Sequence, residues 1–177
     1  MSEEQKAEPS DFASVADFNS LYSSYTEARK GKRWKYAVCK YEANILENLM
    51  FIHFMLTSHK YRLSPYNCFI VKEPKERLIM YNSFRDKIVQ HSLCDNVLEP
   101  RLAKTFILDN YASQKGKGTH FGLDRLKLFM QKFYRQHGTD GWVLKCDVRK
   151  YFYRIDHDVL KSQLRRLIKD TDVLWLL

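Results

Sequence analysis

The chain has 177 residues, of which 45% are hydrophobic and 14% aromatic, and this composition supports a folded core rather than disorder. Its 30 Lys and Arg residues exceed its 21 Asp and Glu residues, and the formal net charge of +9 favours a polyanion such as nucleic acid as partner, with a merely basic surface as the alternative. The four cysteines stand apart without a CxxC pair, which argues against a zinc site or a disulfide framework and favours the cytoplasm.

The sequence predicts neither a secretory leader nor a membrane span. Its first residues, MSEEQKAEPSD, are polar and acidic. The most apolar run, Ile45 to Leu56, is interrupted by Glu47, Asn48 and His53. A bilayer span needs about 20 apolar residues, so we expect no membrane partner.

The first 60 residues are predicted to be mostly helical. We expect a disordered tail at 1–10, then a helix that Ser10 and Asp11 cap and that runs through Phe18 to Leu21. The pattern from Lys40 to Tyr61 predicts one long helix with a broad apolar face.

A basic turn, EARKGKRWKY at 27–36, separates these two helices. Its cations alternate with Trp34 and Tyr36, a combination that suits the backbone and bases of a nucleic acid. A solvated loop that Trp34 anchors to the core is an equally weighted alternative.

A β-hairpin is predicted next. Two apolar segments, Cys68–Val71 and Leu78–Tyr81, flank a charged linker at 72–77. From Asn82 to Arg101 the pattern predicts an amphipathic helix that stops at Glu99–Pro100.

The run YASQKGKGTH at 111–120 has two glycines and two lysines before a predicted helix from Thr119 to Gln136. Glycines let backbone N–H groups approach a phosphate, and a helix N-terminus favours negative charge. The GxxxxGK[ST] spacing of a Walker A loop is absent, and a plain turn explains the run equally well. A turn at 137–141 ends the helix.

The segment from Trp142 to Val148 predicts a buried strand that ends on Asp147. A carboxylate at the carboxyl end of a central strand can hold Mg²⁺. The alternative is that Asp147 only ends a strand and Phe152 only fills the core. Asp156 and Asp158 are expected to cap a final helix, and Asp170 and Asp172 to lie in a polar tail without partners.

Three runs in this order resemble motifs of reverse transcriptases, over roughly residues 63–167. The nearest likeness is to bacterial enzymes of group II introns, retrons and diversity-generating retroelements, and the GKGTH form leans away from the group II intron pattern. The runs are RLI…RDKIVQ at 77–90, YASQKGKGTH at 111–120 and KCDVRKYFYRIDHDVL at 145–160.

The resemblance implies roles for single residues. Asp147 would bind the catalytic Mg²⁺ ions, Val148 would lend its backbone carbonyl, and Phe152 would screen the sugar 2′ position of the incoming nucleotide. Lys72 and Arg77 would close on its triphosphate, where a fixed cation stabilises the developing charge. The positions implied to contact nucleic acid are Arg85, Gln90, Gln114, Lys115 and Lys117.

The resemblance also implies an α+β fold: mostly helical fingers with a β-hairpin, plus the first part of a ferredoxin-like palm sheet. The fingers would span 11–104, and the fingers–palm junction with a partial palm would span 105–177. Two-metal catalysis needs several carboxylates, and the family's later Tyr-x-Asp-Asp hairpin has no counterpart here, because the sequence contains no Asp-Asp pair.

We therefore expect the front part of a longer RNA-directed DNA polymerase, inactive by itself and prone to self-association through an open palm edge. Its partners would be an RNA template, a DNA or RNA primer, a deoxynucleoside triphosphate, and a retroelement RNA or accessory protein. One alternative is a non-catalytic RNA-binding module derived from the same fold. A weaker one is an unrelated basic α/β protein with chance motif matches.

Overall fold

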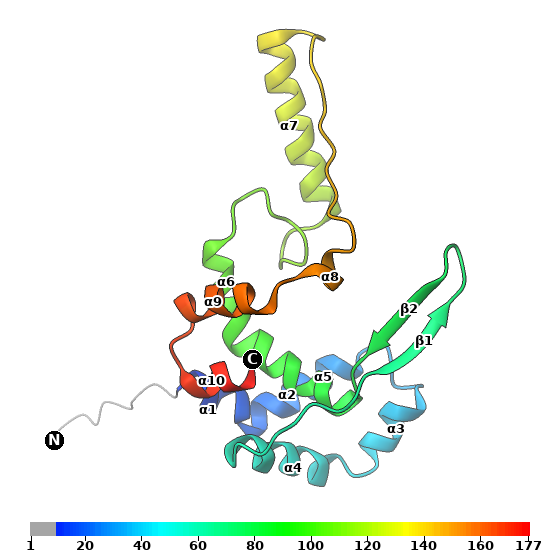
Figure 1. Cartoon of the computed structure of the whole chain (residues 1–177), viewed down its shortest axis with the longest axis vertical. Helices are drawn as coiled ribbons and strands as arrows, with labels where there is room; N and C mark the ends of the chain where they lie inside the picture. Colours follow the sequence, from blue (N-terminus) through cyan, green and yellow to red (C-terminus); the bar gives the residue numbers. More distant parts are fainter. Residues whose placement is uncertain (1–9) are drawn as a thin grey trace, which may run out of the picture. The chain divides into compact units, whose positions relative to one another are not determined.

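The computed structural model describes residues 10–177 and has an α+β fold, as expected: helices with one two-stranded antiparallel sheet (Figure 1). Of the tail expected to be disordered at 1–10, residues 1–9 lie outside the described residues. The chain forms two compact units. Among the described residues, the first unit comprises 10–100 and 168–177, and the second comprises 101–167.

The first unit is built mainly from helices. They are α1 (Asp11–Ala16), α2 (Phe18–Arg29), α3 (Tyr36–Glu42), α4 (Ile45–Thr57), α5 (Phe84–Leu93), the π-helical turn η1 (Cys94–Leu98) and α10 (Thr171–Leu176). Helices α2 and α5 pack against each other, and α4 and α1 cover them. The core contains the fully buried side chains of Leu21, Leu49, Ile52, Leu56 and Ile88. None of the helices formed by residues 10–177 has the length and hydrophobicity that crossing a membrane requires.

The expected first helix is two helices, because Asp17 interrupts it. Ser10 caps α1 as predicted, its hydroxyl accepting a 3.1 Å hydrogen bond from the Ala13 N–H. At Asp17 the backbone becomes extended, and the Asp17 carboxylate accepts from the Ser20 N–H at 3.0 Å to begin α2. A short acidic side chain that bonds nearby backbone competes with a continuous helix.

The expected helix from Lys40 to Tyr61 is also divided, into α3 and α4. The break lies at Asn44, whose backbone is not helical (φ −129°, ψ 47°). Across it, the Asn48 side chain donates a 2.9 Å hydrogen bond to the Tyr41 carbonyl. This contact satisfies one carbonyl at the end of α3, where helical partners run out.

The C-terminal helix α10 docks on α1, so the expectation of a polar tail without partners was wrong. Asp170 accepts hydrogen bonds from the N–H groups of Phe12 at 2.9 Å and Asp172 at 2.9 Å. Asp172 in turn forms a 3.1 Å ion pair with His59. These residues therefore belong to the first compact unit.

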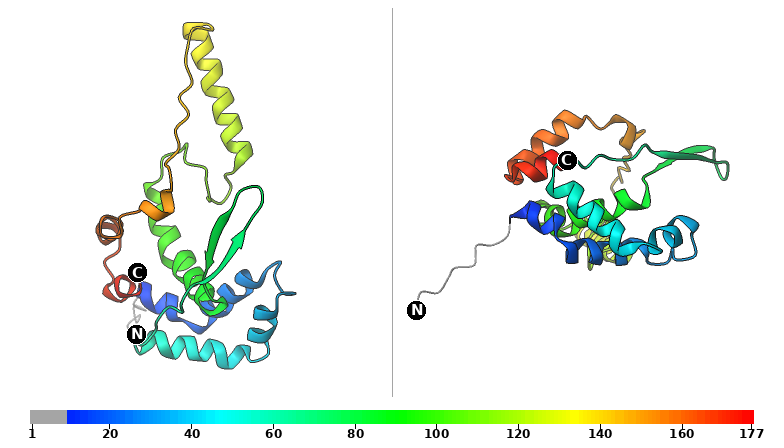
Figure 2. Two further views of the ribbon diagram at one scale, coloured as in Figure 1. Left: turned by 45° about the vertical axis from the view of Figure 1, so that its right-hand side comes forward. Right: turned by 90° about the horizontal axis from the view of Figure 1, so that it is seen from below.

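The hairpin is confirmed as β1 (Asn67–Val71) and β2 (Arg77–Tyr81). Its register pairs Asn67 with Tyr81 and Val71 with Arg77. The hairpin projects from the helices of its own unit (Figures 1 and 2), and four of its apolar side chains are 50–56% exposed: Phe69, Ile70, Leu78 and Met80.

The helix that follows the hairpin is longer than expected. It does not stop at Glu99–Pro100 but continues from α5 through η1 into α6 (Glu99–Leu102) and the 3₁₀ turn η2 (Ala103–Thr105). Pro100 is the second residue of α6 and directly follows the π-helical turn η1, where the α-helical hydrogen-bond pattern is already interrupted.

The second unit has three further helices: α7 (Thr119–His137), α8 (Tyr151–Arg154) and α9 (His157–Leu167). The long helix α7 matches its prediction, and it ends where Gly138, at φ 65°, donates to the Tyr134 carbonyl. Gly122 is the only buried residue among residues 101–167. This unit therefore has very little core of its own.

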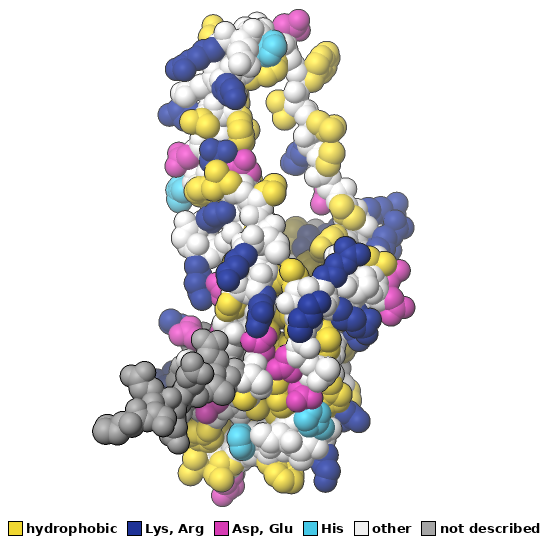
Figure 3. All heavy atoms as spheres, turned by 90° about the vertical axis from the view of Figure 1, so that its left-hand side faces the viewer, with side chains coloured by type: hydrophobic (Ala, Val, Ile, Leu, Met, Phe, Trp, Pro, Cys, Tyr) yellow, Lys and Arg dark blue, Asp and Glu magenta, His cyan; other side chains and the backbone are white. Residues whose placement is uncertain are grey.

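The strand predicted at Trp142–Val148 is not formed. The segment is extended, but it pairs with no other segment among residues 10–177, where the only sheet is β1–β2. Trp142 is 98% exposed and Leu144 is 87% exposed, and Figure 3 shows hydrophobic side chains along this connection. An apolar run becomes a strand only when a neighbouring strand takes up its backbone hydrogen bonds, and the described residues provide no such neighbour for it.

Candidate functional site

Two cations lie at the end of the hairpin, where its charged linker meets the strands. Arg77 pairs with Val71 in the last rung of the sheet, and Lys72 is the residue that follows Val71. Both side chains are exposed, and within residues 10–177 neither forms a hydrogen bond or an ion pair. They are therefore available to an anion such as a phosphate.

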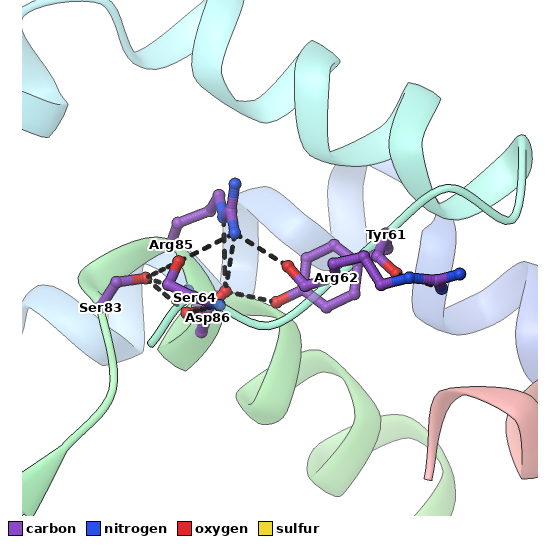
Figure 4. Close-up of polar contacts among 6 residues, drawn as sticks. All are labelled: Tyr61, Arg62, Ser64, Ser83, Arg85 and Asp86. Atoms are coloured by element: carbon purple, nitrogen blue, oxygen red, sulfur yellow. Dashed lines mark hydrogen bonds and ion pairs between the residues drawn. The ribbon is translucent and has the colours of Figure 1, made fainter. Parts of the chain in front are cut away.

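The hairpin is rooted in a polar network around Asp86 (Figure 4). The Asp86 carboxylate is fully buried and accepts hydrogen bonds from the Tyr61 hydroxyl and the Ser83 hydroxyl, both at 2.7 Å, and from the Ser64 N–H at 3.0 Å. Tyr61 and Ser64 lie in the segment before β1, while Ser83 and Asp86 lie just after β2. The network thus ties both ends of the hairpin to the start of α5.

Electrostatics support the ionised form of Asp86. Burial alone would raise the pKa of this carboxyl group, but hydrogen bonds from Tyr61, Ser83 and Ser64 outweigh burial and lower the pKa below its ordinary value. Burial raises the pKa of Tyr61, and its bond to Asp86 adds to that effect, so the tyrosine remains a donor.

Arg85, expected to contact nucleic acid, is partly engaged by the same network. Its Nη2 donates to the Arg62 carbonyl at 3.0 Å and the Ser64 hydroxyl at 2.9 Å, and it lies 3.3 Å from Asp86. Its Nη1 makes no hydrogen bond to any described residue. Gln90, the other position predicted on this helix, lies exposed on α5.

The glycine-rich loop at 111–120 is closed by its own side chains. Lys117 donates to the carbonyls of Leu108 at 2.9 Å and Asn110 at 3.2 Å, and the Gln114 amide also donates to Asn110. Lys115 is exposed. Two of the three positions predicted here to contact nucleic acid therefore hold the loop together in this structure.

Helix α7 holds this loop from its other side. Arg125 pairs with Asp109 through two hydrogen bonds, the second of them, from Nη2, at 3.1 Å. Tyr111 packs so closely on Gly122 that a Cβ there would lie 2.6 Å from its ring. The sequence reasoning missed both contacts, and the glycine inside the α7 pattern was the available signal for a close approach.

Asp147 lies in the unpaired extended segment of the second unit. Its side chain is exposed and has no hydrogen-bond or ion-pair partner among residues 10–177. Val148 is 62% exposed and Phe152 is 84% exposed, and the Phe152 ring contacts Tyr151 at 5.3 Å between centroids. The alternative in which Phe152 fills the core is therefore wrong for this structure.

Asp156 caps α9 as predicted, accepting hydrogen bonds from the N–H groups of Asp158 and Val159.

The donors present do not make a complete two-metal site. Among the described residues no group of three or more His, Cys, Asp or Glu side chains comes together. Asp147 and the Val148 carbonyl provide few oxygens, whereas two Mg²⁺ ions need several carboxylates. Asp147 by itself fits at most one part of such a centre.

The Asp86 network is the feature that sequence reasoning overlooked. Its local part could have been predicted from the sequence, because Ser83 and Asp86 have the spacing of a helix-capping pair. In the structure the Asp86 N–H donates to the Ser83 hydroxyl at 3.2 Å. Its distant part could not be predicted, since Tyr61 lies 25 residues away in the sequence.

A scan against protein-family models finds no match to this chain, and a search of curated proteins finds no significantly similar sequence.

Proposed function

We propose that the chain is the fingers and the first palm segment of an RNA-directed DNA polymerase that acts in the cytoplasm. The observation that carries the proposal is the pair of unengaged cations, Lys72 and Arg77, at the tip of a hairpin whose two ends are anchored by Asp86. The resemblance of the three sequence motifs to reverse transcriptases supports the same assignment.

The hairpin cations would bind the triphosphate of the incoming nucleotide. The planar guanidinium of Arg77 matches two phosphate oxygens at once, and the Lys72 ammonium adds a compact charge. Fixed cations near a transferring phosphoryl group stabilise the negative charge that develops there. Anchoring both strands at their roots limits the positions that these two side chains can sample.

Asp147 would supply one carboxylate to the Mg²⁺ ions, and Phe152 would lie against the sugar of the nucleotide. Bound Mg²⁺ would activate the primer hydroxyl and steady the leaving pyrophosphate. We propose that the remaining carboxylates come from a further part of the polypeptide and that the 177-residue chain does not polymerise by itself. Template RNA, a primer and a retroelement RNA or accessory protein would be its partners.

A nucleotide-binding measurement on the 177-residue chain tests the hairpin's role. Lys72→Ala with Arg77→Ala is expected to weaken binding of a fluorescent deoxynucleoside triphosphate at least tenfold, whereas Lys75→Ala, at the same tip, is expected to change it little. Equal effects of the two variants would contradict a specific role for Lys72 and Arg77. Robust Mg²⁺-dependent primer extension by this chain would contradict the need for further carboxylates.

The second candidate is a non-catalytic RNA-binding module. The absence of a carboxylate cluster among residues 10–177 favours it. Both candidates require salt-sensitive RNA binding, but only the polymerase requires Asp147. Substituting Asp147 in an active, longer protein therefore separates them.

A further inference from the structure

A basic and aromatic surface lies in the first unit, away from the hairpin tip. It consists of the turn between α2 and α3, the exposed side of α3, and the first turns of α5, which packs against α3. We call it the α3–α5 surface; its charged and aromatic members are Lys32, Trp34, Lys35, Tyr36, Lys40, Arg85 and Lys87.

Positive charge is concentrated on this surface. Between residues 27 and 42 there are six Lys and Arg residues and two carboxylates. Both carboxylates are already paired, Glu27 with Lys30 and Glu42 with Arg29. The pKa of Lys87 is lowered by its partial burial and by repulsion from Lys32 and Lys35, so the ammonium groups of Lys32 and Lys35 each lie within electrostatic reach of that of Lys87. Like charges gathered in this way favour an anionic ligand.

A groove continues the surface across the start of α5. It has a volume of about 570 Å³, and none of its lining side chains is acidic. Arg85 lines the groove, and its Nη1 is the part of the guanidinium that the Asp86 network leaves unused. The other polar or aromatic lining residues include Tyr36, Lys40, Asn44 and Ser83.

Large aromatic rings stand beside these cations. Trp34 and Tyr36 are each 79% exposed, which is unusual for rings of this size. The Lys35 ammonium lies 5.4 Å from the centre of the Trp34 ring, and the Lys87 ammonium lies 5.6 Å from that of Tyr81. Cations interleaved with exposed rings are the arrangement by which proteins hold single-stranded nucleic acid, because the rings stack on bases and the cations follow the phosphates.

We propose that the α3–α5 surface binds single-stranded RNA, with phosphates on Lys32, Lys35 and Lys87 and bases stacked on Trp34 and Tyr36. The groove at Lys40 and Arg85 would take the adjoining phosphate. An acidic protein segment would satisfy the cations but would leave the exposed rings unexplained. This binding does not depend on Asp147 or on the hairpin tip, so it can hold if the polymerase proposal fails.

The salt dependence of RNA binding tests the proposal on the 177-residue chain. The slope of log K against log salt is negative, and each lost phosphate contact reduces its magnitude by about 0.7 for a single strand. The triple variant Lys32→Gln, Lys35→Gln, Lys87→Gln is therefore expected to reduce the magnitude of the slope by about 2 for an oligouridine of about 20 nucleotides. A matched triple variant with the same charge change, Lys60→Gln, Lys104→Gln, Lys161→Gln, is expected to leave the slope nearly unchanged.

Two further measurements keep the test decisive. If the Lys87 substitution impairs folding, the Lys32→Gln, Lys35→Gln pair alone is expected to reduce the magnitude of the slope by about 1.4. Trp34→Ala is expected to weaken binding about tenfold at an unchanged slope, because it removes stacking but no charge. The proposal would be overturned if the lysine variants kept the wild-type slope, or if the matched control changed the slope by the same amount. It would also be overturned if Trp34→Ala did not weaken RNA binding, or if polyglutamate bound as strongly as the RNA.

Discussion

The Tyr61 hydroxyl donates a 2.7 Å hydrogen bond to the buried carboxylate of Asp86. This contact joins the segment that leaves α4 to the first turn of α5, and the hairpin β1–β2 lies between the two residues in the chain. The same carboxylate is bound by Ser64 and Ser83, which flank the hairpin directly. A single buried charge therefore fixes where the hairpin leaves the helical unit.

Removing that charge is expected to destabilise the first unit strongly. Asp86→Asn keeps the shape of the side chain but removes the charge that pairs with Arg85, and we expect it to lower the free energy of unfolding by about 3 kcal/mol. Asp95→Asn is the control, since Asp95 is exposed and lies 3.9 Å from His91. It is expected to change stability by less than about 0.5 kcal/mol. Urea unfolding of both variants measures the difference, and similar losses would contradict a special role for Asp86.

The stability of the protein should depend on pH through the ionisation of Asp86. The pKa of Asp86 is lower in the folded protein than its ordinary value, so the unfolded state binds more protons as the pH falls. The contribution of Asp86 to the free energy of unfolding is complete above the ordinary Asp pKa of about 3.9. It declines as the pH falls through the lower pKa that Asp86 has in the folded protein. We expect wild-type stability to fall more steeply than that of Asp86→Asn below about pH 4. Parallel stability curves for the two proteins would show that Asp86 is not responsible.

A substitution at Tyr41 is expected to stabilise the protein rather than to destabilise it. Its hydroxyl is buried and has no hydrogen-bond partner among the described residues. Tyr41→Phe removes this unpaired group and is expected to raise the free energy of unfolding by about 1 kcal/mol. Tyr25→Phe is the matched change, and it should lower stability, because the Tyr25 hydroxyl donates to Glu42 at 2.8 Å and accepts from Arg29 at 3.0 Å. A loss of stability in Tyr41→Phe would refute this reasoning.

Local signals in the sequence predicted much of the fold. Ser10 caps α1, the two apolar runs form the hairpin, and α7 begins and ends within a residue of its expected limits. Where the prediction failed, the deciding partner was distant or a cap competed with a helix. Asp17 divides a helix that apolar spacing alone would continue. Asp170 gains its role only because Phe12, 158 residues earlier, offers an N–H group.

The candidate site was predictable only in part, and for the same reason. Lys72 and Arg77 follow from the hairpin register, which the apolar runs define. The segment around Asp147 has the composition of a strand, but strand formation depends on a neighbour that local sequence cannot specify. The position of Asp147 therefore could not be derived from its own run of residues.

The exposed segment at 142–144 is expected to cause self-association. Two of its residues, Trp142 and Val143, line an open, largely apolar groove of about 620 Å³ together with α7, and large exposed apolar surfaces favour association. Val143→Lys is expected to reduce the concentration-dependent rise in mass measured by light scattering. Leu46→Lys, on the exposed face of α4, serves as a comparison and should have a smaller effect. A strictly monomeric wild type at high concentration would contradict this expectation.

Primer extension tests the central claim most directly. In a longer, active protein that contains this chain, Asp147→Asn is expected to reduce RNA-templated DNA synthesis at least about a thousandfold while RNA binding persists, because a metal-binding carboxylate is lost. Asp140→Asn removes an exposed carboxylate from the preceding turn and is expected to leave synthesis nearly unchanged. Undiminished synthesis by the Asp147→Asn protein would contradict the assignment of this chain to a polymerase that uses Asp147.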